Sequence, residues 1–249
     1  MTQKLTGKVA LVTGGSRGIG AATALALADA GADVAISFAT SADQADAVVT
    51  ELEHKRVRAV SFKADQADSL QVKELVDAVV ERFGRLDILI NNAGVLAMAS
   101  VDNPRNDLAA LKRQHEINFS GVVAAIRAAV DVMAEDGRIV TVGCGVNTRV
   151  GFPALADYTA TKAAVIGYSK GAARDLAARN ITINVVQRGF VETDMSTTNG
   201  AYASAFKATT AFGRYARPEE IAAAIVFLAS PDASYITGTV LNVDGGYGA

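Results

Sequence analysis

The sequence is poor in the residues that build metal sites and disulfides. It contains one cysteine, two histidines and no tryptophan. The single cysteine, Cys144, leaves no partner for an internal disulfide and excludes a site built from several cysteines. The histidines, His54 and His115, do not have the spacing of a zinc-binding helix. We therefore expect neither a bound metal nor a disulfide scaffold.

Strong charge of one sign and long apolar runs are missing as well. Lys and Arg total 24 and Asp and Glu total 26, which gives a net charge of −2 at pH 7. The charges are interspersed, with no basic stripe for a nucleic acid and no polybasic patch for a membrane. No apolar run reaches about 18 residues, and the first residues lack a secretory signal. We expect a soluble, cytoplasmic protein that binds small molecules, not nucleic acids or membranes.

What the chain does have is a regular alternation of short apolar runs with helical patterns. Its 249 residues, 50% of them apolar, are enough for one large core. Such alternation favours an α/β fold, a parallel sheet with helices on both faces, in a single domain spanning 1–249. The predicted strands are 9–13, 34–38, 57–62, 87–91, 137–143, 181–186 and 239–243, and the predicted helices are 21–30, 41–55, 67–83, 108–133, 158–179 and 218–230.

A glycine-rich turn follows the first predicted strand. Gly14, Gly18 and Gly20 are spaced as Gly-x3-Gly-x-Gly between that strand and the first helix. Glycines permit a tight turn and a close approach of the backbone to a pyrophosphate, which then meets the free amides of the helix. The spacing differs from GxGxxG, but its strand-turn-helix context predicts a dinucleotide site rather than an ordinary turn.

The end of the second predicted strand indicates which dinucleotide is bound. Folds that prefer NAD place a carboxylate there for the ribose 2′-hydroxyl, whereas this chain has Phe38-Ala39-Thr40-Ser41. With no acid to repel a 2′-phosphate, and with Arg17 and two hydroxyls to bind one, we predict NADP(H) over NAD(H). The ordinary alternative is that Arg17 is a solvated turn residue.

A tyrosine and a lysine lie one helical turn apart, at Tyr158 and Lys162. This spacing places both side chains on one face of a helix. A neighbouring ammonium favours the phenolate and lowers the pKa of the phenol toward working pH, so that Tyr158 can exchange a proton with a carbonyl or alcohol oxygen. Alone, such a pair more often means one packed ring and one solvated amine, but the glycine-rich turn favours the catalytic interpretation.

Five motifs together resemble the short-chain dehydrogenase/reductase family over essentially the whole chain. They are Thr13-Gly-Gly-Ser-Arg-Gly-Ile-Gly20, Asn91-Asn-Ala-Gly94, Asn118, Tyr158-x3-Lys162 and the segment around Thr193. Within that family the chain resembles the 3-oxoacyl-acyl-carrier-protein reductase branch. The stretch 181–187 and the last two residues are similar to a reductase-like bacterial protein described as binding cyclic di-GMP in biofilm dispersal. The resemblance implies a seven-stranded Rossmann sheet and a homotetramer.

The resemblance also implies roles for individual residues. Tyr158 would be the acid in reduction and the base in oxidation, Lys162 would lower its pKa and hold the nicotinamide ribose, and Asn118 would support a water in a proton relay. With Cys144 these form the candidate catalytic set. The candidate cofactor-binding residues are Gly14, Ser16, Arg17, Gly18, Ile19, Gly20, Phe38, Ala39, Thr40, Ser41, Asp65, Gln66, Asn92, Ala93, Gly94, Tyr158, Lys162, Gly189, Val191 and Thr193.

Two positions depart from the family pattern. The family normally has a serine where the fifth strand ends, to hydrogen-bond the substrate oxygen, and here the residue is Cys144, whose thiol is a weaker donor. We expect a small residue in the pocket wall rather than a nucleophile, and lowered activity. Arg188 replaces the usual proline before the nicotinamide-binding segment, which would loosen that segment. Its guanidinium either binds an anion or projects into solvent.

Two functions are compatible with these residues. The first is an NADPH-dependent carbonyl reductase, reversible as an alcohol dehydrogenase, acting on a small or medium ketone under a substrate lid at 195–213. The second is a regulatory protein that binds a nucleotide such as cyclic di-GMP on the same scaffold with little catalysis, a reading suggested by Cys144 and Arg188. We favour the first, because a scaffold kept only for binding would not need Tyr158 and Lys162 together.

Overall fold

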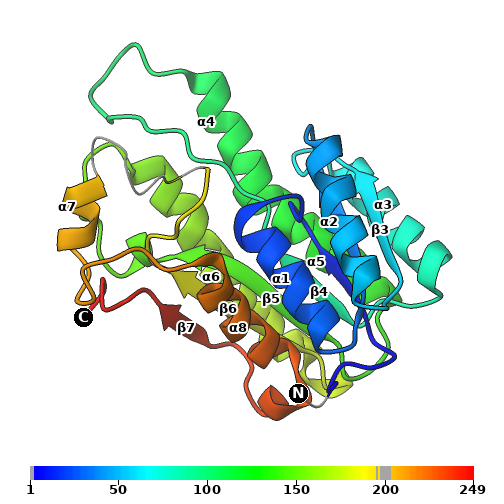
Figure 1. Ribbon diagram of the computed structural model, residues 1–249. Coiled ribbons are helices and arrows are strands. Elements are labelled where there is room, and N and C mark those ends of the chain that lie inside the picture. Colours follow the sequence, from blue (N-terminus) through cyan, green and yellow to red (C-terminus); the bar gives the residue numbers. More distant parts are fainter. Residues whose placement is uncertain (1–2, 195, 197–202) are drawn as a thin grey trace.

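The computed structural model describes residues 3–194, 196 and 203–249. Seven parallel strands form one sheet in the order β3-β2-β1-β4-β5-β6-β7 (Figure 1). This confirms the predicted seven-stranded parallel sheet of Rossmann type. The strands are β1 (Val9–Val12), β2 (Asp33–Phe38), β3 (Ala59–Lys63), β4 (Ile88–Asn91), β5 (Arg138–Cys144), β6 (Thr182–Arg188) and β7 (Val240–Val243).

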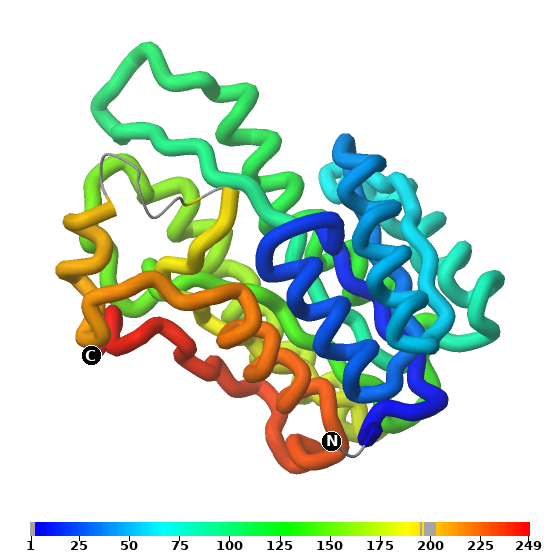
Figure 2. Tube along the Cα trace, viewed as in Figure 1, coloured from blue at the N-terminus to red at the C-terminus, as the bar shows by residue number. Residues whose placement is uncertain are grey.

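Helices cover both faces of the sheet. They are α1 (Gly18–Asp29), α2 (Ala42–His54), α3 (Ser69–Phe83), α4 (Leu108–His115), α5 (Gly121–Val132), α6 (Ala156–Leu176), α7 (Ala203–Ala208) and α8 (Pro218–Ala229). Helices α1, α2 and α8 share one apolar cluster with the strands, and α3, α5 and α6 share another. The tube in Figure 2 shows α4 and the segment before it projecting away from these layers.

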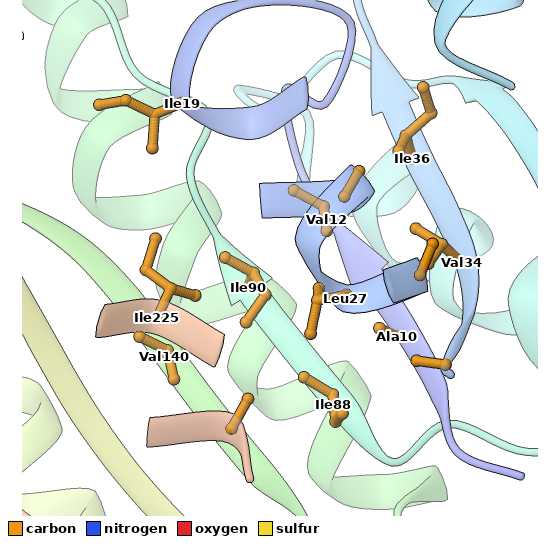
Figure 3. Close-up of a cluster of buried hydrophobic side chains, with 14 of the residues drawn as sticks. Ala10, Val12, Ile19, Leu27, Val34, Ile36, Ile88, Ile90, Val140 and Ile225 are labelled. Carbon is orange, nitrogen blue, oxygen red and sulfur yellow. The ribbon is translucent and has the colours of Figure 1, made fainter. Parts of the chain in front are cut away.

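The central strands are buried on both sides, which explains their continuous apolar runs. In β1, Ala10 and Val12 belong to the cluster under α1 and α8, whereas Val9 and Leu11 belong to the opposite cluster. Figure 3 shows the first of these clusters, with Ile225 of α8 beside the strands. Burying each large aliphatic side chain contributes about 1.5–3 kcal/mol, so these two layers hold the ends of the strands in fixed positions.

Three predicted boundaries were wrong in ways that concern the site. Helix α1 begins at Gly18, earlier than predicted, so Gly18 and Gly20 lie inside the helix. The predicted helix 108–133 is interrupted by a π-helical turn, Glu116–Ser120, which turns Asn118 into the protein interior. Strand β6 continues two residues farther than predicted and ends at Arg188. π-Turns are frequent at functional sites.

Arg188, which replaces the family's proline, lies in regular sheet pairing. It pairs in parallel register with Cys144 of β5 and with Val243 of β7. Looser backbone after this position stays a prediction. In the part of the chain that the structure describes, no helix combines the length and apolar character needed to cross a membrane.

Candidate functional site

A cleft of about 360 Å³ opens where the strands end at their carboxyl edge. Its walls come from segments far apart in the sequence: the turn after β1, the ends of β2 and β3, the segment after β4, the end of β5, helix α6 and the segment after β6. Parallel strands with right-handed crossovers bring all these ends to one edge. The cleft is therefore the place where the sequence motifs meet.

The glycine-rich turn fits tightly against the segment that follows β4. Gly14 has φ +63°, and a Cβ there would lie 2.9 Å from the Cα of Ala93. A Cβ on Gly20 would lie 2.2 Å from the carbonyl oxygen of Gly14, closer than any side chain permits. The Asn92 amide donates to the carbonyl oxygens of Thr13 and Gly14 at 3.0 and 2.9 Å. These close approaches explain why glycines occupy the turn.

The amino end of α1 faces this cleft without competing groups. Its N-cap, Arg17, makes no side-chain capping hydrogen bond, and the first turn contains no acid. Gly18, Ile19 and Gly20 line the cleft. Free amides and the positive end of a helix dipole make a site for an anionic group. The residues therefore fit a pyrophosphate at this point.

The outer end of the cleft is lined by Phe38, Ala39, Thr40 and Ser41 at the end of β2. None of these carries a carboxylate. The exposed Arg17 guanidinium lies here. Its ion-pair partner is the carboxylate of Asp194, 3.5 Å away, whose side chain is also exposed. A cation that is held only loosely is available to a 2′-phosphate.

Asp65, a predicted cofactor-binding residue, is paired with an arginine from a remote helix. Both of its oxygens accept hydrogen bonds from Arg113 of α4 at 2.9 Å. Asp65 still lines the cleft beside Gln66 and Arg113. One guanidinium nitrogen of Arg113 thus donates to both carboxylate oxygens, and this ion pair neutralises the charge of the carboxylate.

Tyr158 and Lys162 lie on successive turns of α6, and both line the inner end of the cleft. The Tyr158 side chain is 5% exposed and Lys162 is 6% exposed. The Lys162 ammonium donates to the carbonyl oxygen of Val142 at 3.1 Å and lies 6.0 Å from the centre of the Tyr158 ring. The spacing one turn apart does bring the two side chains to one site.

The electrostatics of this pair differ from the simple expectation. Burial raises the pKa of Tyr158 above its usual value, the adjoining Cys144 adds to this effect, and the positive charge that opposes it is that of Arg188. Burial, followed by repulsion from Arg188, lowers the pKa of Lys162 to about 8. In the chain without ligands the pKa of the phenol is therefore raised and not lowered, and Arg188 is the cation that opposes the rise. The predicted effect of the Lys162 ammonium on the phenolate stays a prediction.

Arg188 points into the cleft and not into solvent. One nitrogen of its guanidinium donates to the Tyr158 hydroxyl at 3.4 Å, and another donates to the carbonyl oxygen of Gly189 at 3.1 Å. The guanidinium is buried although the residue as a whole is half-exposed to the cleft. Of the two placements considered from the sequence, solvent is wrong.

Two predicted catalytic residues lie behind the wall of the cleft. Cys144 is 7% exposed and packs with Val146 and Tyr158, so its thiol adjoins the phenol. The Asn118 side chain accepts from the amide of Val95 and donates to its carbonyl oxygen, both at 2.9 Å. Neither residue reaches the cleft surface. The side chain of Asn118 thus holds the loop after β4.

Most of the predicted cofactor-binding residues line this one cleft. Gly189 does not: it lines a second cavity with Phe190 and Asp244, and a Cβ there would meet the Asp244 backbone at 2.8 Å. Sequence reasoning missed the lining residues Ser37, Ala64, Val95, Arg113, Ile117, Val142, Gly143 and Asp194. Several simply adjoin a recognised motif, but Arg113 has no local signal, because its partner Asp65 is remote in sequence. Arg188 was singled out as a departure but not as a site residue.

The predicted lid at 195–213 lies partly outside the described residues, which exclude 195 and 197–202. Helix α7 follows, and its Phe206 ring stacks on Phe190 with centroids 4.4 Å apart. Phe152 packs edge-on against the Phe206 ring, with centroids 4.7 Å apart. These aromatic contacts join α7 to the segments that follow β5 and β6.

Comparison with known proteins finds similar reductases and dehydrogenases. The family model described as Enoyl-(Acyl carrier protein) reductase matches residues 14–248. The 3-oxoacyl-[acyl-carrier-protein] reductase of Synechocystis sp. is 41% identical over 245 residues, covering 97% of each chain. A short chain dehydrogenase from Burkholderia cenocepacia, solved in complex with NADP, has a TM-score of 0.96 and 44% identity over 99% of this chain and 100% of that one. The blue fluorescent protein from a metagenomic library, solved with NADPH, has a TM-score of 0.96 and 40% identity, covering 99% and 100%.

Proposed function

Because this chain belongs to the short-chain dehydrogenase/reductase family, in its 3-oxoacyl-acyl-carrier-protein reductase-like branch, we propose that it is an NADP-dependent carbonyl reductase. Its substrate is a small or medium ketone, and the reverse reaction oxidises a secondary alcohol. The observation that carries this proposal is that Tyr158 and Lys162 line the same cleft as the glycine-rich turn. A proton donor and a dinucleotide site in one cleft are the two parts that carbonyl reduction needs.

The cleft residues fit NADP(H) from end to end. The turn at Gly14 and the amino end of α1 would hold the pyrophosphate, and Arg17 with Thr40 and Ser41 would hold the 2′-phosphate. Asn92 to Gly94, Val191 and Thr193 would line the ribose and nicotinamide positions. The two solved relatives carry NADP and NADPH, which supports this choice. When bound, the cofactor supplies or accepts the hydride.

The chain itself supplies position and a proton. Tyr158 would hold the substrate oxygen and give it a proton during reduction, and Lys162 would hold the nicotinamide ribose. Burial makes the isolated phenolate costly, so the charges of Lys162 and Arg188 would stabilise Tyr158 at the moment it loses its proton. Asn118, through the loop that it fixes at Val95, keeps the wall opposite Lys162 in place. Its support of a relay water is part of this proposal.

The direct test is the rate of NADPH oxidation with a panel of ketones, including 3-oxoacyl thioesters. We expect turnover of at least one class, with a rate that declines above about pH 8, because Lys162 loses its charge there and no longer stabilises the developing phenolate. Below that pH the ammonium is present and the rate is retained. Absence of substrate-dependent NADPH loss across the panel would overturn the proposal.

The choice of NADP(H) over NAD(H) gives a separate prediction at Arg17. Replacing Arg17 by Ala removes a charge-assisted contact to the 2′-phosphate, and we expect the Kd for NADPH to rise about tenfold. The Kd for NADH stays close to the wild-type value, because NADH has no 2′-phosphate for Arg17 to hold. Fluorescence titration at low ionic strength measures both constants, since salt screens this exposed side chain.

The matched control for Arg17 is Arg105→Ala, which removes an exposed arginine outside the cleft. It should leave both dissociation constants unchanged. Equal losses of NADPH and NADH affinity in the Arg17→Ala variant would mean that Arg17 holds the common pyrophosphate and not the 2′-phosphate.

Other parts of the proposal concern the whole assembly. We propose that 195–213 forms the substrate lid and that the chain assembles as a homotetramer, as the resemblance implies; solution mass measures the latter. The alternative of a nucleotide-binding regulator stays a prediction from the sequence, and calorimetry with cyclic di-GMP measures it directly. The presence of Tyr158 and Lys162 in one cleft favours the enzyme.

A further inference from the structure

The inner end of the cleft holds two cations, and the described residues provide no acid to match them. Within that part of the chain, the Lys162 ammonium donates to one carbonyl oxygen, and the Arg188 guanidinium donates to a phenol and a carbonyl oxygen. Among residues 3–194, 196 and 203–249, no carboxylate pairs with either cation at ion-pair distance. Buried charges are ordinarily paired, so we expect this end of the cleft to bind an anion from outside the chain.

The other charged groups of the cleft do not change this balance. Arg113 and Asp65 neutralise each other through two hydrogen bonds, and Arg17 stands beside Asp194 at the exposed outer end. The unmatched positive charge is therefore concentrated around Tyr158. Cofactor phosphates bind at the glycine-rich turn and leave this charge in place.

The contact between Arg188 and Tyr158 specifies where an anion would lie. A ketone oxygen that accepts the Tyr158 proton sits about 2.7 Å from the phenol, and Arg188 is 3.4 Å from the same hydroxyl. In a 2-oxo acid the ketone and the carboxylate occupy adjacent carbons. One guanidinium beside the phenol can thus hold the carboxylate while the phenol holds the ketone oxygen.

We propose that Arg188 forms a carboxylate-binding subsite beside Tyr158, which makes 2-oxo acids the preferred substrates of this chain. The proposal rests on the proposed function and refines its substrate class. In the reaction the ketone carbon gains a hydride with its two electrons from the reduced nicotinamide. The oxygen gains the proton of Tyr158, and the C=O bond becomes a C–OH bond. Tyr158 then regains a proton from solvent, and the product is a 2-hydroxy acid.

Backbone geometry supports a dedicated role for this side chain. Arg188 lies in regular pairing between β5 and β7, with Cys144 opposite it in register. A residue fixed in a central strand presents its side chain in one direction, unlike a residue in a loop. The guanidinium is thus positioned before the substrate arrives, and a planar fork of donors matches a carboxylate in two parallel hydrogen bonds.

The first arm of the test measures binding without turnover. Oxamate is an unreactive analogue of a small 2-oxo acid, and oxamide is its uncharged counterpart. We expect calorimetry on the NADP-loaded protein to show that Arg188→Gln weakens oxamate about tenfold or more, whereas Arg188→Lys weakens it less. Oxamide should bind weakly to all three proteins. Equal oxamate affinity in the wild type and in Arg188→Gln would overturn the subsite.

The second arm compares phenylglyoxylate with its methyl ester as substrates. The ratio of kcat/KM for the acid over the ester should fall about tenfold or more in Arg188→Gln and should be partly kept in Arg188→Lys. Arg127→Gln, on the exposed face of α5, is the control for loss of an arginine elsewhere. A parallel loss of acid and ester turnover in Arg188→Gln would overturn the subsite, because Arg188 would then act on the ketone oxygen common to both.

The two proposals fail in distinguishable ways. If oxamate binding depends on Arg188 but no ketone is reduced, the carboxylate subsite stands and the reductase proposal fails. If esters and ketones are reduced while the affinity for oxamate does not depend on Arg188, the reductase proposal is supported and the carboxylate-subsite proposal fails. Circular dichroism of each variant verifies that the fold is retained.

Discussion

Replacing Tyr158 by Phe is expected to lower kcat for NADPH-dependent ketone reduction by about 10³-fold, within the range that a positioned acid contributes. The change removes one oxygen atom, at the hydroxyl that Arg188 contacts at 3.4 Å. The ring stays packed against Cys144 and Val146. Steady-state rates and the Kd for NADPH, measured on the same preparation, separate loss of chemistry from loss of cofactor.

The matched control for this variant is Tyr168→Phe, on the same helix but outside the cleft. Tyr168 is half-buried against the core, so its hydroxyl is removed without touching the reacting groups. We expect near wild-type turnover from the control and near wild-type NADPH affinity from Tyr158→Phe. Turnover that survives in Tyr158→Phe would assign the proton donor elsewhere, and the alternative acid in the cleft is Lys162, whose pKa is about 8.

The sequence was sufficient for the parts of the fold that depend on local pattern. Apolar runs of strand length predicted all seven strands, because the five interior strands are largely buried on both faces and the edge strands β3 and β7 are partly covered. Glycines with positive φ or with no room for a Cβ marked the turn after β1. The spacing of Tyr158 and Lys162 predicted their common face, because helix geometry determines it.

What the sequence could not provide depends on contacts between remote segments. The ion pair of Arg113 with Asp65 joins α4 to the segment after β3, and the residues next to either partner in the sequence do not indicate it. The π-turn at Asn118 follows from the fit of its amide to Val95, a contact across 23 positions. The pKa of Tyr158 likewise depends on burial and on Arg188, 30 positions away. Charge pairing and desolvation are properties of the assembled cleft.

The pairing of Arg188 with Cys144 in the sheet favours one explanation for both departures from the family pattern. They are partners across β5 and β6, so the two departures from the family pattern lie side by side and both adjoin Tyr158. One removes a hydroxyl donor from the substrate oxygen, and the other brings in a stronger, charged donor. With the proposed carboxylate subsite at Arg188, the pair would shift recognition away from a neutral carbonyl held by two hydroxyls and toward a substrate that carries an anion.

This arrangement predicts that Cys144→Ser raises kcat/KM for a neutral ketone, by about 10²-fold if the full oxyanion contact is restored. A hydroxyl donates to developing negative charge much better than a thiol does. Cys144 lies just behind the cleft wall, directly after the lining residue Gly143, and adjoins the phenol. The gain therefore requires the serine hydroxyl to reach the ketone oxygen past that wall. Initial rates of NADPH oxidation with the methyl ester of phenylglyoxylate measure the gain.

The Cys144→Ala variant tests whether the gain in Cys144→Ser comes from the added hydroxyl or from removal of the larger sulfur. Alanine removes the sulfur of this buried side chain without adding a donor, so we expect no gain, and a gain equal to that of serine would mean that sulfur bulk, not the lost donor, limits the wild type. The gain from serine with this neutral ester should be the same when Arg188 is replaced by Gln, because the proposed partner of the guanidinium is a carboxylate that the ester lacks. A larger gain in the Arg188→Gln background would mean that Arg188 acts on the ketone oxygen, which would contradict the carboxylate subsite.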